Sequence, residues 1–433
     1  MKIEINNRKI INAWCSYDIA NSAYNLIITS ALFPVYYQIV TKQSFLGEMV
    51  SIWGMNLKSS VLYTYTISIA YLIILCFTPL LSGIADYVGR RKRFMQFFTL
   101  IGSISCFSLY WFTGTNLEFG IVMIGLAVIG YSGSVVFYNS FLPQIATPDR
   151  HDKISSRGFA LGYLGSVTLL AFIIIMIEKY EFFGFSGKLQ VMRFGFLMVG
   201  VWWILISQIA FYYLKDFPID YKLSKRLVLK GVYELIRVFR KMQKNKSIKI
   251  FLPAFFFYSM GVQTIMLVAA MFAESEIHIT GAKLIQIIFI LQFLGIIGSI
   301  LFGRVSMWLG NKTSIIIMLF IWIGVSISAY FIQTEGQFMI LAGSVGLVMG
   351  GIQSQSRSTF SKLIPQNTRE TASYFSFYDT TEKITIVLGM ALYGFIDQVT
   401  GNMRIGSAIL GIFFLIGLVI IFNIRLEKPA KVG

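Results

Sequence analysis

Runs of about 20 apolar residues recur from one end of the chain to the other, and each is long enough to cross a bilayer as a helix. The pattern predicts an all-α integral membrane protein. Composition agrees, because 56% of residues are hydrophobic and 13% charged, against about 25% charged in soluble domains. Twelve transmembrane helices are expected, at 14–36, 61–83, 94–113, 119–142, 156–177, 194–214, 250–272, 283–303, 313–332, 337–357, 374–395 and 404–424.

The distribution of charge predicts how these spans are oriented. The chain has 37 Lys and Arg against 20 Asp and Glu, a net charge of +17 that in a soluble protein would suggest nucleic-acid binding. Here 29 of the 37 basic residues fall on the side of the N-terminus, seven fall on the other side, and Lys383 lies inside a span. Since cytoplasmic loops are enriched in Lys and Arg, we expect an N-in/C-in multi-pass protein, of the cell membrane if bacterial, with no nucleic-acid partner.

The long loop at 215–249 separates two six-helix halves, 1–214 and 250–433. Short motifs recur between the halves at nearly constant offsets, and Gly89 and Gly310, which each follow the second span of a half, are 221 residues apart. A duplicated six-helix unit would produce this repetition.

Within that loop, residues 223–246 combine an apolar stripe with many basic residues. The stripe at helical spacing consists of Val228, Val232, Leu235, Ile236, Phe239 and Met242. Such a helix is expected to lie on the inner leaflet and attract anionic lipid headgroups. A solvated linker with some helical content is the alternative.

Polar residues in the first span form one of two groups whose burial at membrane depth costs free energy. On a helix, Tyr17, Asp18, Asn21, Ser22 and Asn25 are expected to share one stripe. This stripe cannot face lipid without leaving polar groups unpaired. We expect it to face a cavity or another helix, either as a substrate or proton site or as a hydrogen-bond cluster that only holds helices together.

The second costly group lies in the eleventh span, where Asp379 and Lys383 are four residues apart and can form an ion pair. Glu382 borders the same face. A pair that opens and closes would couple transport to a proton, which a carboxylate beside a like charge binds more readily. A static pair that fixes helix packing is the alternative.

A cytoplasmic gate is predicted after the second span. Gly89 permits a tight turn, Asp86 can accept hydrogen bonds from a facing helix N-terminus, and Arg90 can pair across the gate. Residues 91–93 are assigned mainly to topology. In the tenth span, Gln353 and Arg357 share a face, and Arg357 either extends to the cytoplasm or closes the gate.

Enzymatic motifs are missing from the sequence. It contains no HExxH, no Walker A loop and no GxSxG, and its three cysteines lack metal-type spacing. We therefore expect no catalytic residues, no metal and no cofactor. The alternatives to a transporter are a receptor or scaffold on a carrier fold and, less favoured, a membrane enzyme.

The loop from Asp86 through Gly89 to Arg90 resembles the loop signature of the major facilitator superfamily, with two departures, Ser82 and Tyr87. Five further blocks are similar to the "unknown major facilitator" family, related to the fungal vacuole effluxers. They comprise residues 17–24, 137–143, 160–165, 350–357 and 378–383, where Glu382 stands in place of an expected small residue.

This resemblance implies a major facilitator fold that works by a rocker-switch mechanism, with an amino-acid-like substrate that Asp18 and Lys383 would bind as a zwitterion. A monomer is expected. The implied substrate or coupling residues are Tyr17, Asp18, Asn21, Tyr24, Asn25, Asn139, Tyr163, Gln353, Tyr378, Asp379, Glu382 and Lys383. The implied gate residues are Asp86, Gly89, Arg90, Arg157 and Arg357.

Overall fold

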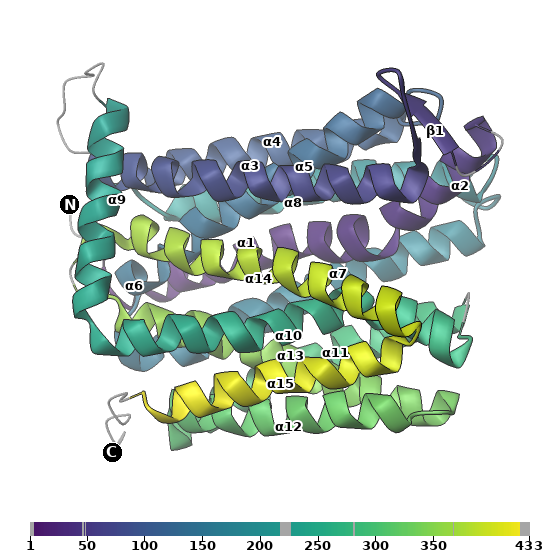
Figure 1. Ribbon diagram of the computed structural model, residues 1–433. Coiled ribbons are helices and arrows are strands. Elements are labelled where there is room, and N and C mark those ends of the chain that lie inside the picture. Colours follow the sequence, from purple (N-terminus) through teal and green to yellow (C-terminus); the bar gives the residue numbers. More distant parts are fainter. Residues whose placement is uncertain are drawn as a thin grey trace.

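The computed structural model describes residues 4–45, 47, 49–216, 227–279, 282–366 and 368–424. Long helices run side by side through the molecule, and helix α9 (Leu227–Lys244) stands across their ends (Figure 1). Within the described ranges, eleven helices are long and apolar enough to cross a membrane, and a bent pair at the N-terminus would make a twelfth. The prediction of a helical integral membrane protein is confirmed, and one short β-hairpin is added to the expected helices.

The N-terminal group of elements precedes α9. It consists of α1 (Arg8–Ala23), the π-helix η1 (Tyr24–Ala31), α2 (Phe33–Phe45), strands β1 (Met49–Ile52) and β2 (Met55–Lys58), α3 (Ser59–Val88), α4 (Arg91–Ser108), η2 (Leu109–Trp111), α5 (Leu117–Asn139), α6 (Leu142–Ile145), η3 (Pro148–Arg150), α7 (His151–Glu178) and α8 (Lys188–Tyr213). The two strands pair antiparallel as a hairpin, with Met49 opposite Lys58.

The C-terminal group follows α9 and lies beside the N-terminal group (Figure 1). It consists of α10 (Lys246–Ile277), α11 (Ala282–Leu309), α12 (Asn311–Phe331), α13 (Glu335–Leu363), α14 (Thr371–Thr400) and α15 (Met403–Phe422). We call the end of the molecule crossed by α9 the α9 end, and the opposite end, with β1 and β2, the hairpin end.

The first span differs from the predicted 14–36. Its helix begins at Arg8, because the Asn7 side chain accepts hydrogen bonds from the backbone N–H groups of Lys9 and Ile10 at 2.9 and 3.4 Å. It continues through the π-helix η1 and bends by 42° before α2. The first turns are too polar for a hydropathy pattern to include them, and Arg8, Lys9 and Asn12 are exposed there.

Several other helices extend beyond their predicted spans. Helix α13 covers Glu335–Leu363 rather than 337–357, because Thr334 and Gln337 form a capping box at its start. Helix α10 covers Lys246–Ile277 rather than 250–272. An apolar run marks only the part of a helix in hydrocarbon, whereas hydrogen bonding carries the helix onward into the polar layers.

The amphipathic helix predicted at 223–246 is present as α9, and its predicted start, at 223–226, lies outside the described residues. Gly231 packs against α3 so closely that a Cβ on Gly83 would lie 2.4 Å from the Gly231 carbonyl oxygen. Val238 and Met242 are buried with the core of the C-terminal group. Helix α9 therefore contacts both groups.

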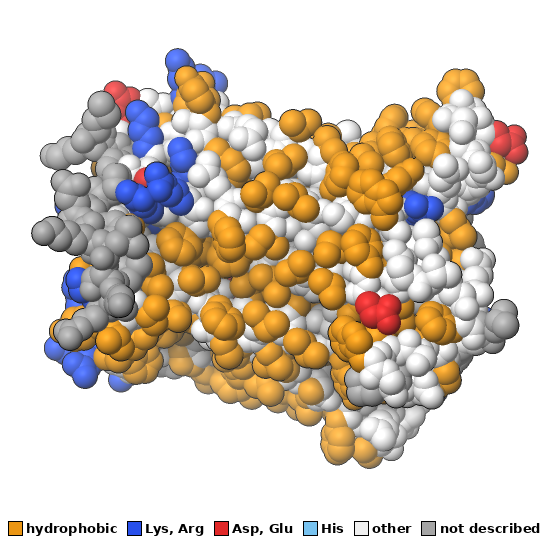
Figure 2. All heavy atoms as spheres, turned by 90° about the horizontal axis from the view of Figure 1, so that it is seen from above, with side chains coloured by type: hydrophobic (Ala, Val, Ile, Leu, Met, Phe, Trp, Pro, Cys, Tyr) orange, Lys and Arg blue, Asp and Glu red, His pale blue; other side chains and the backbone are white. Residues whose placement is uncertain are grey.

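The side chains on the surface also change in type between the middle of the molecule and the α9 end. In Figure 2, hydrophobic side chains cover the middle of the face seen, and Lys and Arg gather toward the α9 end. The exposed side chains along the spans include Ile69, Leu72 and Phe77 of α3. A wide apolar band with basic residues at one end is the surface expected of a multi-pass membrane protein.

Candidate functional site

An ion pair between the two groups lies at the centre of the candidate site. The Arg357 guanidinium, from α13, is 3.1 Å from a carboxylate oxygen of Asp18, from α1. Both side chains are buried, and the Tyr138 hydroxyl donates to the same carboxylate at 2.7 Å. The expectation that Asp18 faces another helix is confirmed. The alternative that Arg357 extends to the cytoplasm is wrong, because Asp18 holds its side chain inside the protein.

The surroundings of Arg357 satisfy its remaining donors. Its Nε donates to the Ser155 hydroxyl, and Nη2 donates to the Ser155 carbonyl, both at 2.9 Å. The guanidinium also lies over the rings of Trp14 and Phe159, at 4.8 and 4.2 Å from their centroids. This enclosure offsets the cost of burying a charge.

Four more predicted residues lie around this pair. The Asn139 side-chain oxygen accepts from Arg357 at 3.4 Å, and Asn21 is buried on α1. The Tyr163 hydroxyl, from α7, donates to the side-chain oxygen of Gln353, from α13, at 3.0 Å. The predicted residues thus meet where the N-terminal and C-terminal groups touch.

Four predicted residues point elsewhere, and two of them, Tyr17 and Asn25, show that the single polar stripe expected on the first span is wrong. The Tyr17 hydroxyl bonds to Thr99 at 2.6 Å within the N-terminal group, and Asn25 is exposed beyond the end of α1. Tyr24 packs between Tyr131 and Trp203, and Tyr378 stacks on Phe255 at 4.3 Å. Asn25 leaves the face of Asp18 because η1 changes the helical repeat after Ala23.

A second charged cluster lies on α14. The predicted pair of Asp379 and Lys383 is confirmed at 3.2 Å, and Glu382 lies 3.7 Å from the same ammonium. Gln263 of α10 donates to Glu382 at 2.7 Å, and the ammonium faces the Tyr71 ring of the N-terminal group at 5.8 Å. The Glu382 side chain is 22% exposed, against 6% for Asp379 and 7% for Lys383, so Glu382 is the most accessible charge of the cluster.

The predicted gate turn is present at the α9 end. Gly89 adopts φ = +71°, and Asp86 accepts backbone N–H bonds from Ala372 and Ser373, at the start of α14, at 3.2 and 2.7 Å. The arginine that pairs with Asp86 is Arg91, at 2.6 Å, which the sequence analysis assigned to topology. Arg91 is the first residue of α4, and the turn at Gly89 directs it back toward Asp86.

The two remaining gate candidates, Arg90 and Arg157, lie near this end. Arg90 occupies the N-cap position of α4, and Arg157 donates to Asn12 at 2.7 Å within the N-terminal group. Sequence reasoning missed Glu370, which is buried before α14 and binds Lys241 of α9 with both carboxylate oxygens at 2.7 Å and also Arg237. No spacing rule links a loop acid to a helix 129 residues away.

The chain is similar in sequence to known proteins over nearly its whole length. The profile of the vacuole effluxer Atg22-like family matches residues 6–432. The MFS-type transporter YxiO of Bacillus subtilis is 31% identical over 98% of this chain and 96% of its own length. The autophagy-related protein 22 of Kluyveromyces lactis is 26% identical over 88% of this chain and 82% of its own.

Solved structures share the fold. The fucose:proton symporter FucP of E. coli superposes with a TM-score of 0.69 at 14% identity, covering 96% of this chain and 98% of its own. A bacterial homologue of the iron transporter ferroportin, in an outward-facing state, gives a TM-score of 0.66 at 11% identity, covering 96% and 98%. At these identities the likeness establishes the major facilitator fold alone.

Proposed function

The chain belongs to the Atg22-like vacuole effluxer family of major facilitator transporters, and from this premise we propose that it is a secondary active transporter of a small organic solute. The proposed transport is by rocker-switch alternating access, with residues 1–214 and 250–433 as the two moving bodies and 215–249 as their connection. The observation that carries the proposal is the buried pair of Asp18 and Arg357, which joins the two bodies and must separate if they rock.

We propose that both termini are cytoplasmic. In this orientation the α9 end faces the cytoplasm, and the contacts of Asp18 and Asp86 with the C-terminal group close that side. The arrangement described would then be the outward-facing state. Opening to the cytoplasm would break these contacts and expose the buried charges to water.

For the substrate we propose a solute with an ammonium and a carboxylate, such as an amino acid. Lys383 supports a carboxylate contact, and the carboxylate of Glu382 is the accessible partner for an ammonium. Asp18, which the resemblance implied for the ammonium, already has Arg357 and Tyr138 as partners. Glu382 and Asp379 are also the proposed sites of proton coupling.

The test is uptake by the purified protein in liposomes, with amino acids first in the substrate panel and with or without an imposed pH gradient. We expect accumulation of at least one amino acid that rises with the gradient. Asp379→Asn, which keeps the Glu382 carboxylate for the ammonium, should retain binding better than gradient-driven uptake. If no amino acid accumulates, the substrate class is wrong, and if the gradient has no effect, proton coupling is wrong.

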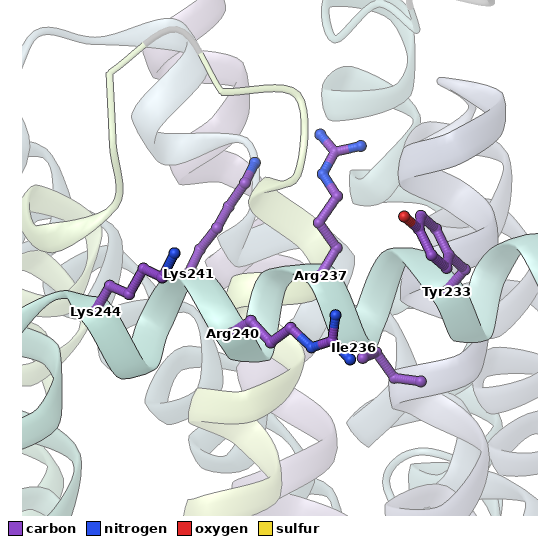
Figure 3. Close-up of a pocket in the computed structure, with 6 residues that line it drawn as sticks. All are labelled: Tyr233, Ile236, Arg237, Arg240, Lys241 and Lys244. Atoms are coloured by element: carbon purple, nitrogen blue, oxygen red, sulfur yellow. The ribbon is translucent and has the colours of Figure 1, made fainter.

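We further propose that α9 binds anionic lipid and that the transporter is a monomer. A hollow along α9 is lined by Tyr233, Ile236, Arg237, Arg240, Lys241 and Lys244 (Figure 3). Arg237 and Lys241 bind Glu370, whereas exposed Ile236 lies beside Arg240. Exposed apolar and basic side chains together match a phospholipid headgroup and its adjoining acyl chain.

Replacing Arg240 and Lys244 by glutamine should reduce the stimulation of transport by phosphatidylglycerol in liposomes. The matched control replaces the exposed Lys42 and Lys179, near the hairpin end, and should keep the stimulation. If both variants lose the stimulation equally, the effect depends on the overall charge of the protein and not on α9. Elution as a dimer in detergent would contradict the monomer.

A further inference from the structure

A second buried carboxylate, which belongs to none of the motifs described above, joins the two groups at the α9 end. Asp152, the second residue of α7, is buried and accepts from four side chains of the C-terminal group. These donors are Ser306 at 3.0 Å, Asn311 at 2.7 Å, Lys362 at 2.6 Å, and Ser358. Both carboxylate oxygens are therefore saturated from across the interface.

The positions of these donors repeat those around Asp86. In the first contact, Asp86 lies two residues before the end of α3, its partner Arg91 is the first residue of α4, and both face the N-terminus of α14. In the second, Ser306 lies three residues before the end of α11, Asn311 is the first residue of α12, and both face the N-terminus of α7.

The duplicated unit explains this correspondence. Gly89 and Gly310, which follow α3 and α11, both adopt positive φ, at 71° and 86°. The same offset of 221 residues relates Asp152 to Ser373, whose backbone N–H binds Asp86 at 2.7 Å. The two contacts are thus the same junction with its polarity reversed. In the first contact the carboxylate lies near the end of α3, and in the second it lies at the start of the facing helix α7.

We infer that Asp152 is the second-half counterpart of Asp86 and that the two carboxylates form a double clamp that holds the α9 end closed. The end of α11 has no acid that corresponds to Asp86 at the end of α3. The inference goes beyond the gate proposed above because it assigns that role to Asp152 on α7. Asp152 is a positioning residue that contacts no substrate. Moving α7 away from α11, α12 and α13 breaks all four of its bonds together, so Asp152 favours the closed α9 end.

The experiment measures distances between spin labels in the full chain, with the native cysteines replaced by alanine. One pair, at the exposed Arg150 and Gln366, reports the α9 end. The other, at the exposed Lys179 and Gln333, reports the hairpin end. We expect Asp152→Asn to raise the population with a long distance at the α9 end at least about fivefold and to shorten the distance at the hairpin end. Opposite changes at the two ends are not produced by loss of packing alone.

Asp86→Asn should shift the populations in the same direction, and the double variant should shift them further. The matched control is Glu276→Gln, which removes an acid that binds Arg404 at 2.8 Å within the C-terminal group and should leave both distances unchanged. If Asp152→Asn does not fold, Lys362→Met, which removes a half-exposed partner, carries the same expectation. Distance distributions that match the wild type, or that move no more than those of Glu276→Gln, would overturn the inference. Because the readout needs no substrate, it is independent of the proposed solute.

Discussion

At the scale of single residues, the pair of Asp18 and Arg357 contributes to the stability of the protein and must also separate in the proposed transport cycle. Each is buried, and each would leave an unpaired charge if its partner were removed. Breaking such a pair costs about 3–5 kcal/mol, whereas removing both charges is often tolerated. A residue pair that served only packing would therefore be dispensable as a pair, and one that served the transport cycle would not.

This distinction gives the first prediction. Asp18→Asn should lower the melting temperature markedly, because it leaves the Arg357 charge buried without an anion, and a double variant with Arg357→Gln should recover most of that loss. We expect neither to transport normally, since the pair no longer biases the two states. Thermal unfolding and uptake in liposomes are measured side by side. Full uptake by the double variant would show the pair to be structural.

The second prediction concerns Gly158, whose lack of a side chain lets α7 approach α1. A Cβ at this position would lie 2.3 Å from a carboxylate oxygen of Asp18 and 3.0 Å from Nη2 of Arg357. Gly158→Ala should therefore separate the pair and cost about 1–3 kcal/mol of stability. The control is Gly324→Ala on α12, where a Cβ would meet no atom within 4 Å and should be neutral or stabilising. Thermal unfolding of the two variants compares them directly.

At the scale of elements, α9 links the gate to the surface. Glu234 lies on its buried side, near the carboxylates of Glu370 and Asp86 and beside Arg237 at 3.3 Å. Burial raises the pKa of Glu234, Arg237 opposes this shift, and Glu370 adds to it. The docked helix therefore binds the Glu234 proton more tightly than a detached helix would.

Proton binding by Glu234 and docking of α9 are linked, and this linkage gives the direction in which docking changes with pH. Because the pKa of Glu234 is higher when α9 is docked, docking should strengthen as the pH falls through that raised pKa and weaken as the pH rises above it. Hydrogen–deuterium exchange of α9, corrected for the intrinsic rate at each pH, is expected to slow on acidification. Glu234→Gln should remove this dependence. Protection of α9 that increases with pH would contradict the assignment.

Elements and their partners differ in how far a sequence predicts them. Apolar runs located all the spans, and the spacing of Asp379 and Lys383 gave their pairing, because both are local patterns. The bend of the first span, by contrast, depends on packing of η1 inside the protein. The partners of Asp18 and Asp152 come from helices at least 120 residues away, and no periodicity within one chain segment encodes them.

At the scale of the whole molecule, polar contacts between the N-terminal and C-terminal groups extend from the α9 end to the middle, and apolar contacts of Ile288 and Phe289 with the N-terminal core lie beyond them. The polar contacts begin with Asp86 and Asp152 and continue through Arg357 to the pair of Tyr163 and Gln353. The charged cluster of Lys383 lies at a similar depth, facing Tyr71. In the transport cycle proposed above, release toward the α9 end therefore requires both clamps to break.

The closed α9 end can be fixed chemically to test this order. The Gln144 amide donates to the Thr371 hydroxyl across the interface at 3.0 Å, so cysteines at these two positions would lie within reach of a short bifunctional thiol reagent. With the native cysteines replaced, cross-linking should abolish uptake, and a reducible linker should restore it on reduction. Binding of the substrate from the hairpin end should persist, because that path does not pass the linked residues. A cross-linked protein that still completes transport would show that the two groups need not separate at the α9 end, and a rocker-switch mechanism could not then operate.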